Sequence, residues 1–262
     1  MRDLLVLSGG HPYEAEPFAA LLASLTRWRV LHLLHPEAEA AVADGVAEKA
    51  DVLLFYDMPG YVFADGKVAS HPPSAAFVDA IERHFAAGKG AVMLHHALAG
   101  WADWPGWSEM LGGRFLYQPG KVRGRLCLDS GYAHDVDYHA VVVADHPVTR
   151  GLPERFAVND ELYLAQVFED DVTPLIRADA RFERDSFSSA AHAVAGRMLD
   201  NSDWPHPPGS NLIGWTRAIN AAQMVYLQFG DGPASYANPH VRRAIANALD
   251  FVAHAERTKE RS

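Results

Sequence analysis

The stretch AVMLHHALAGW, residues 91–101, joins a short apolar run to two adjacent histidines. An apolar run bounded by glycine on one side and polar groups on the other is typical of a buried strand in a parallel sheet. In open α/β sheets, ligands bind just beyond the carboxyl ends of such strands. We therefore expect a functional site at His95 and His96. Because successive side chains of an extended chain point to opposite faces, we favour His95 over His96.

The segments before this stretch predict alternating strands and helices. Short apolar runs predict strands at 4–7, 30–34 and 52–56. One helix follows Pro17, where apolar residues recur at helical spacing, and the alanine-rich segment 37–49 is a second. Strands that alternate with helices predict a parallel α/β sheet with right-handed connections.

The remaining elements are predicted from turn residues and apolar runs. Residues 57–73 contain several Pro and Gly and are expected to form a long loop over the strand ends. Ser74 caps the next helix. Residues 114–143 mix β-forming residues with Gly, Pro and Asp, which predicts an insertion rich in strands and loops. Later strands are expected at 162–168, 172–176, 212–215 and 224–229, followed by a helix from Pro239 and a frayed tail after Ala255.

Length and composition restrict the class of protein. A chain of 262 residues fits one domain, residues 1–262, and the contents of 49% hydrophobic and 21% charged residues are typical of a globular protein. The formal charge of -10 disfavours nucleic acid and anionic membranes as partners. We expect a cytoplasmic protein, since neither a signal peptide nor an apolar stretch of about 20 residues is present. With Cys127 as the single cysteine, an intrachain disulfide and a thiolate metal cluster are excluded.

Three segments together resemble the ThuA-like, or trehalose-utilisation-protein-like, domain family. They are LHHALAGWADWPGWSEMLGGRF (94–115), ADHPVTRGLPERFAVNDELY (144–163) and VYLQFGDGPASYANPHVRRAIANALDFV (225–252). The resemblance implies the fold of class I glutamine amidotransferases, an α/β flavodoxin-like three-layer sandwich with a mostly parallel central sheet. It also implies a role in sugar metabolism with no nucleotide cofactor. Where many relatives have a histidine after the glycine of the last segment, this chain has Asp231.

The position after the central strand excludes one activity of that fold. A glutamine amidotransferase needs a cysteine nucleophile at this turn, activated by a histidine base. This chain has His95 and His96 there, and Cys127 lies in the insertion. We therefore do not expect glutaminase activity.

Histidine and carboxylate side chains are the candidates for catalysis. His95 is suited to acid–base chemistry or metal binding, because its pKa is ordinarily near neutrality. Glu161 is its expected partner, and His96 is a weaker catalytic candidate. Together His11, His95 and Glu161 form a possible two-histidine, one-carboxylate site for a divalent metal, Zn²⁺ or Mn²⁺. The alternative is structural, with His95 and Glu161 bonded to each other or to backbone groups.

A tryptophan cluster and several polar residues are candidates for substrate binding. Indole rings stack on the apolar faces of sugars, so Trp101 and Trp104 are expected to contact a carbohydrate. Trp107 is assigned to the core, since apolar residues follow it at helical spacing. The other substrate-binding candidates are Tyr56, Asp57, His134, Asp160, Tyr163 and Asp231. Capping of loop backbone groups is an equal possibility for Asp57, and simple solvation is one for His134.

Three functions follow from these residues. The first is an enzyme that acts on a sugar, glycoside or keto-sugar by acid–base or metal-assisted chemistry. The second is a non-catalytic sugar-binding or regulatory protein on the same scaffold. The third is an assembly partner whose tryptophan-rich surface contacts another protein or a second copy of this chain in a homo-oligomer.

Overall fold

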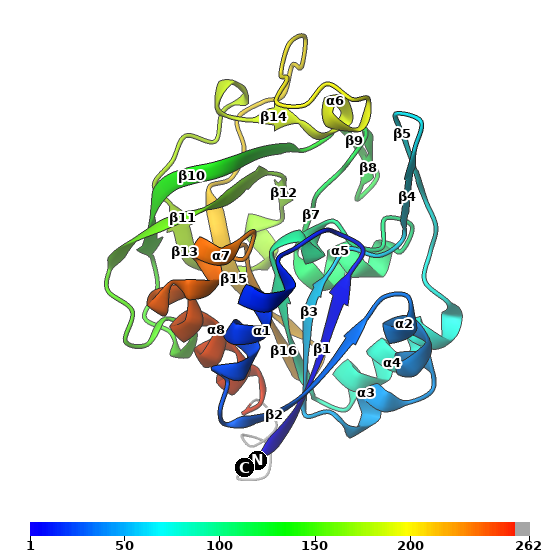
Figure 1. The fold of residues 1–262 in the computed structure, drawn as a ribbon, viewed down its shortest axis with the longest axis vertical. Coiled ribbons are helices and arrows are strands. Elements are labelled where there is room, and N and C mark those ends of the chain that lie inside the picture. The colour runs from blue at the N-terminus through cyan, green and yellow to red at the C-terminus, as the bar shows by residue number, and fades with distance from the viewer. Residues whose placement is uncertain (255–262) are drawn as a thin grey trace.

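A computed structural model describes residues 1–254 and shows a ten-stranded sheet between two layers of helices (Figure 1). The predicted α/β three-layer arrangement is confirmed. The tail that was expected to fray after Ala255 lies outside the described residues.

Half of the sheet is parallel and contains the strands predicted at 4–7, 30–34, 52–56 and 224–229 and the apolar run 91–94. Its order is β16-β6-β3-β1-β2, and each neighbouring pair is parallel. The bounds are β1 (Arg2–Gly9), β2 (Trp28–Leu34), β3 (Val52–Asp57), β6 (Gly90–Leu94) and β16 (Ala222–Leu227). Every residue of β3 and β6 is buried, as expected for strands covered on both faces.

An antiparallel extension completes the sheet beyond β16, in the order β15, β13, β10 and β11. The short β14 pairs with β10. The bounds are β10 (Gly131–Val142), β11 (Arg155–Leu164), β13 (Thr173–Ala178), β14 (Ser188–Ser189) and β15 (Leu212–Ile219).

Alternate side chains of β1 enter different cores. In β1, Leu4 and Val6 pack with helices α1 (Ala15–Ala23), α7 (Pro233–Ala237) and α8 (Pro239–Val252). Leu5 and Leu7 point to the other face, which four helices cover. These are α2 (Glu37–Ala43), α3 (Val46–Lys49), α4 (Ala75–Ala86) and α5 (Pro105–Leu111). The period of two residues in a strand therefore produces both cores.

Three predicted elements differ in the structure. The segment 37–49 is two helices, because Gly45 adopts a left-handed conformation with φ 93° and ends the first of them. The expected loop 57–73 contains the hairpin β4 (Tyr61–Ala64) and β5 (Lys67–Ser70). Asp65-Gly66 forms its turn with both φ values positive, which is typical of two-residue hairpins. The strand expected at 162–168 instead ends at Leu164 as part of β11.

The segment 114–143 is rich in strands, as predicted, but it does not fold separately. Its last strand, β10, joins the main sheet and pairs with β11. The other strands are β7 (Gly113–Arg114), β8 (Gly120–Val122) and β9 (Arg125–Cys127), of which β7 pairs with β12 (Gln166–Val167). Short helices complete the chain: η1 (His95–Leu98), η2 (Pro147–Thr149), η3 (Glu169–Asp171), η4 (Arg184–Ser186) and α6 (Ala190–Val194).

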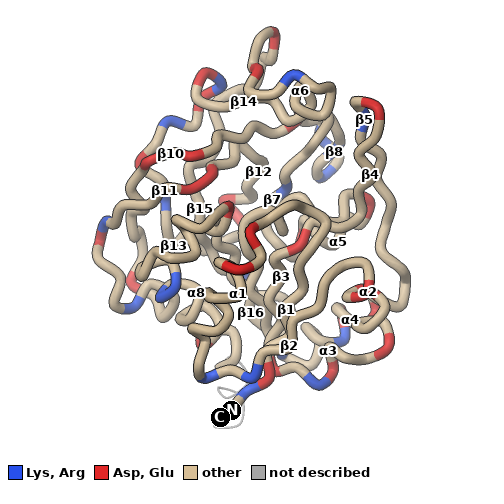
Figure 2. Tube along the Cα trace, in the orientation of Figure 1, with Lys and Arg blue, Asp and Glu red and all other residues tan. Residues whose placement is uncertain are grey.

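Charged residues are distributed over the whole trace. Figure 2 shows Lys and Arg scattered among Asp and Glu. None of the helices within residues 1–254 has the length and apolar character that crossing a membrane requires.

Candidate functional site

His95 lies at a sharp turn at the carboxyl end of β6. The strand ends at Leu94, and His95 begins η1 with a φ of 46°. A positive φ is uncommon for a residue other than glycine, and such strained positions cluster at functional sites. The turn gives the two histidine rings different directions, with an interplanar angle of 79°.

The ring of His95 is held on one side and faces acidic groups on the other. Its Nδ1 donates a hydrogen bond of 2.7 Å to the backbone oxygen of Gln228. Its Nε2 lies 3.1 Å from Oε2 of Glu161 and 3.6 Å from Oδ1 of Asp231. The hydroxyl of Tyr163 is 2.7 Å from the same nitrogen. All four side-chain groups therefore meet at one point.

Glu161 and Asp231 also face His134, which lies on β10. Nδ1 of His134 is 3.0 Å from Oε1 of Glu161 and 4.0 Å from Oδ2 of Asp231. The cluster therefore combines the ends of β6 and β16 with β10 and β11 of the antiparallel extension. Such a set of imidazoles and carboxylates can transfer protons or bind a divalent cation.

The cluster strongly shifts the pKa values of its members. Burial alone lowers the pKa of His95, but the carboxylates of Asp231 and Glu161 raise it to about 10. Burial raises the pKa of Glu161, and the bonds to His134 and His95 outweigh this effect and lower it well below its usual range. The bond to Glu161 raises the pKa of His134. The cluster therefore favours charged rather than neutral groups.

A cavity of about 140 Å³ opens beside Glu161. It is lined by His11, Phe115, Tyr117, Tyr132, His134, Tyr163 and residues of α6. This cavity can admit water or part of a small ligand to the cluster. Tyr163 and His134 are thus placed where substrate contact was predicted, and that role stays a prediction.

The metal site predicted at His11, His95 and Glu161 needs a correction at His11. His11 lines the cavity, but its ring stacks on His96 at 4.8 Å and its Nδ1 bonds to the backbone oxygen of Pro12. Asp231 completes the group with His95 and Glu161, with ligand atoms all within 4.8 Å of one another. The physical reason is the sheet order, because β3 lies between β1 and β6 and moves the end of β1 away.

His96 is turned away from the acidic cluster. It is buried, and its Nε2 lies 3.3 Å from the backbone oxygen of Tyr56. Burial and the neighbouring histidines, His11 and His95, hold its pKa well below the usual value. The predicted catalytic role of His96 has no support from this position.

Three predicted substrate-binding residues instead have internal partners. The hydroxyl of Tyr56 bonds to the backbone oxygen of Gly230 and to Tyr236. Asp57 is completely buried and bonds to Nε2 of His35 at 2.7 Å. Burial of their polar atoms makes both residues part of the scaffold.

Asp160 is the third of these residues and holds the segment that carries Asp231. Its carboxylate accepts bonds of 2.9 Å from the backbone nitrogens of Gly230 and Asp231. It also accepts a bond of 2.6 Å from the Ser235 hydroxyl. Because these bonds occupy both of its oxygens, Asp160 positions the site and does not face a substrate.

The predicted sugar-stacking role of the tryptophans is wrong for Trp101. Its side chain is 1% exposed and packs against Phe77, with ring centroids 5.4 Å apart. Trp104 is 8% exposed, packs against Trp107 and lines a different cavity. The core assignment of Trp107 is confirmed, since it is completely buried and its Nε1 donates to the backbone oxygen of Ala97.

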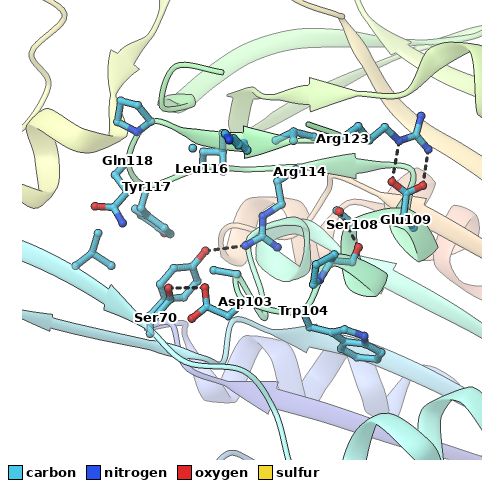
Figure 3. A pocket seen from close by; sticks show the side chains of 18 of the residues that line it. Ser70, Asp103, Trp104, Ser108, Glu109, Arg114, Leu116, Tyr117, Gln118 and Arg123 are labelled. Carbon is cyan, nitrogen blue, oxygen red and sulfur yellow. Dashed lines mark hydrogen bonds and ion pairs between the residues drawn. The ribbon is translucent and has the colours of Figure 1, made fainter. Parts of the chain in front are cut away.

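That second cavity has a volume of about 440 Å³ and lies beside Arg114 (Figure 3). Arg114 is buried and donates to the backbone oxygen of Gly100 and to the hydroxyl of Tyr61. Ser70 donates to Asp103, and both side chains line the same cavity. Sequence reasoning missed this cavity, because a single arginine after two glycines forms no recognisable pattern. Tyr117 lines both cavities.

Comparison with solved structures shows which known folds this chain resembles. A ThuA-like protein from Parabacteroides merdae has a TM-score of 0.67 and 13% identity, over 96% of this chain and 90% of that one. A cytoplasmic protein from Salmonella typhimurium has a TM-score of 0.58 and 12% identity, over 96% of this chain and 99% of that one. PurLQS from Thermotoga maritima has a TM-score of 0.53 and 11% identity, over 96% of this chain and 99% of that one. The glutamine amidotransferase-like fold is thereby confirmed.

Sequence comparison identifies the family. No curated protein shows significant similarity to this sequence. The model of the ThuA family, described as trehalose utilisation, matches residues 3–252 and therefore covers nearly the whole chain. The protein belongs to the ThuA family.

Proposed function

We propose that this protein is an enzyme of sugar metabolism that acts on a sugar, glycoside or keto-sugar beside His95 and Glu161. One observation carries the proposal: Nε2 of His95 and the carboxylates of Glu161 and Asp231 converge at the carboxyl edge of the sheet. This is the edge at which α/β sheets bind ligands. The family description, trehalose utilisation, supports a carbohydrate as the substrate class.

The chemistry of the cluster suits a substrate with hydroxyl and carbonyl groups. Imidazole and carboxylate groups can transfer a proton at a carbon next to a carbonyl, or activate water for hydration or hydrolysis. The same groups can instead hold a divalent cation that polarises a substrate oxygen. His134 is 44% exposed in its side chain and lines the small cavity, so it is placed to contact the substrate.

Glutaminase activity is not part of the proposal. His95 occupies the turn after the central strand, and an imidazole there cannot form the thioester that a cysteine forms. Cys127 lies in the β8–β9 hairpin and not at this turn.

The alternative is a sugar-binding or regulatory protein without turnover. This alternative fits the turn after the central strand, where His95 stands in place of the cysteine nucleophile of glutamine amidotransferases. This alternative predicts saturable binding with no conversion.

The test is incubation of the purified protein with a panel of sugars, glycosides and their keto derivatives, followed by NMR. We expect conversion of at least one compound, and loss of conversion in His95→Ala and Asp231→Asn with nearly unchanged melting temperatures. Asp200→Asn is the matched control, because Asp200 also pairs with a histidine but lies outside the cluster. Full conversion by Asp231→Asn and His95→Ala would refute the proposed site, and binding without conversion would support the alternative.

A further inference from the structure

We infer that His95, Glu161 and Asp231 bind one divalent transition-metal cation. The ligand atoms of these three residues all lie within 4.8 Å of one another. Two ligands that are each about 2.1 Å from a cation are at most roughly 4.2 Å apart. The observed separations of 3.1 and 3.6 Å from Nε2 of His95 are inside this limit, so small side-chain movements complete the site.

The backbone prepares His95 as a ligand through Nε2. A carbonyl oxygen only accepts, so the 2.7 Å contact with the Gln228 oxygen requires the proton on Nδ1. A metal ion would replace the proton that Nε2 carries between the two carboxylates, and the lone pair of this nitrogen would then point to the metal. Metal-binding histidines ordinarily fix their other nitrogen in this way. The positions of Nε2 and the two carboxylates, which now surround a proton, would then surround the cation.

The charges around His95 also favour a divalent ion. Three carboxylates, those of Asp160, Glu161 and Asp231, lie at this edge, and the first two are 4% exposed. Within residues 1–254, their ion-pair partners are His95 and His134, with no Lys or Arg among them. Even with both imidazoles charged, one negative charge remains. Buried charge is costly unless it is paired, and a divalent cation supplies the missing charge at the point where the ligands meet.

The type of metal follows from the donors. An imidazole nitrogen with carboxylate oxygens suits Zn²⁺ or Mn²⁺, whereas Mg²⁺ prefers an all-oxygen, largely hydrated site. The cavity beside Glu161 leaves a position for water or substrate oxygen, as in catalytic metal sites. His134 bonds to the second oxygen of Glu161 and orients this carboxylate.

The experiment uses the full chain after treatment with a chelator and dialysis. ZnCl₂, MnCl₂ and MgCl₂ are titrated separately by isothermal calorimetry, and the melting temperature is measured with each metal. We expect one Zn²⁺ or Mn²⁺ per chain, little binding of Mg²⁺, and at least tenfold weaker binding in Glu161→Gln and Asp231→Asn. Asp231→Asn preserves shape at a side chain that is 28% exposed, so it tests the site even if His95→Ala fails to fold.

Matched controls separate this site from surface histidines. The pair of His192 and Asp200 also joins an imidazole to a carboxylate at 3.4 Å, but it lacks the second carboxylate. Asp200→Asn should therefore bind Zn²⁺ as the wild type does. Equal affinity in wild type, Glu161→Gln and Asp231→Asn would overturn the inference, as would no binding of Zn²⁺ or Mn²⁺. One bound metal without conversion of any sugar would overturn the proposed function and leave the metal site intact.

Discussion

Replacement of Asp160 by Asn is expected to destabilise the protein and to loosen the segment that carries Asp231. Oδ1 of Asp160 accepts from the backbone nitrogens of Glu161 and Asp231. Oδ2 accepts from the nitrogen of Gly230 and the hydroxyl of Ser235. In Asn an NH₂ group takes the place of one of these oxygens. At either position this NH₂ group faces at least one backbone N–H, and two donors cannot bond to each other.

The magnitude follows from these four contacts. The Asn amide fits best at the Oδ2 position, because the Ser235 hydroxyl can rotate and accept, whereas the N–H of Gly230 cannot. The buried N–H of Gly230 then has no acceptor, and the remaining bonds are to a neutral amide instead of a carboxylate. Bonds to charged groups contribute about 1.5–3 kcal/mol each, so we expect Asp160→Asn to lower the free energy of unfolding by about 2–4 kcal/mol. Ser235→Ala removes one bond and should lower it by about 1 kcal/mol.

Urea denaturation of wild type, both single variants and the double variant measures these values. The double variant should lose less than the sum of the two single losses, because Asp160 and Ser235 share a bond. Zn²⁺ affinity should also fall in Asp160→Asn, although Asp160 is not a ligand. A loss below about 0.5 kcal/mol in Asp160→Asn, or a larger loss in Ser235→Ala, would refute this account.

Three further substitutions test the scaffold. Trp107→Ala should lower the free energy of unfolding by about 3–5 kcal/mol in urea, because the indole is completely buried; a loss under 1 kcal/mol would contradict this packing. Gly60→Ala should lower the melting temperature, since Gly60 has a φ of 88° and its added Cβ would lie 2.9 Å from the ring of Trp101. Gly124→Ala is the control, with a similar φ of 76° in open space, and an equal loss there would show that the contact is unimportant. Burial lowers the pKa of His84 from 6.5 to about 4, so the free energy of unfolding should fall by roughly 3 kcal/mol as the pH decreases from about 6.5 to 4. His84→Gln should make the free energy of unfolding, measured in urea titrations, depend less on pH. An unchanged pH dependence would exclude His84 as its source.

Much of the fold is determined by local sequence patterns. The runs 4–7, 52–56 and 91–94 predict β1, β3 and β6, because a strand buried on both faces needs consecutive apolar residues. The edge at which these strands end predicts His95 as a candidate site residue. The structure also brings His95 to 3.1 Å from Glu161, its expected partner, although their catalytic role stays a prediction.

The local patterns did not predict every boundary correctly. The dipeptide Asp65-Gly66 is typical of a hairpin turn, but the Pro and Gly residues around it favoured the prediction of a loop. The start of β11 at Arg155 depends instead on its pairing with β10, from which it is separated by a turn and η2. A strand that is half exposed has too few apolar residues to be recognised without its partner.

The sequence by itself therefore determined the alternation of strands and helices, the family resemblance and the choice of His95 as a candidate site residue. The tertiary structure decided which groups accompany it. Strand order places β3 between β1 and β6, so Asp231 rather than His11 joins His95 and Glu161. Packing buries Trp101 and Asp57, which local sequence placed at a ligand site. The physical reason is that periodicity reports which face of an element is apolar, whereas neighbours and burial depend on contacts between residues far apart in the chain.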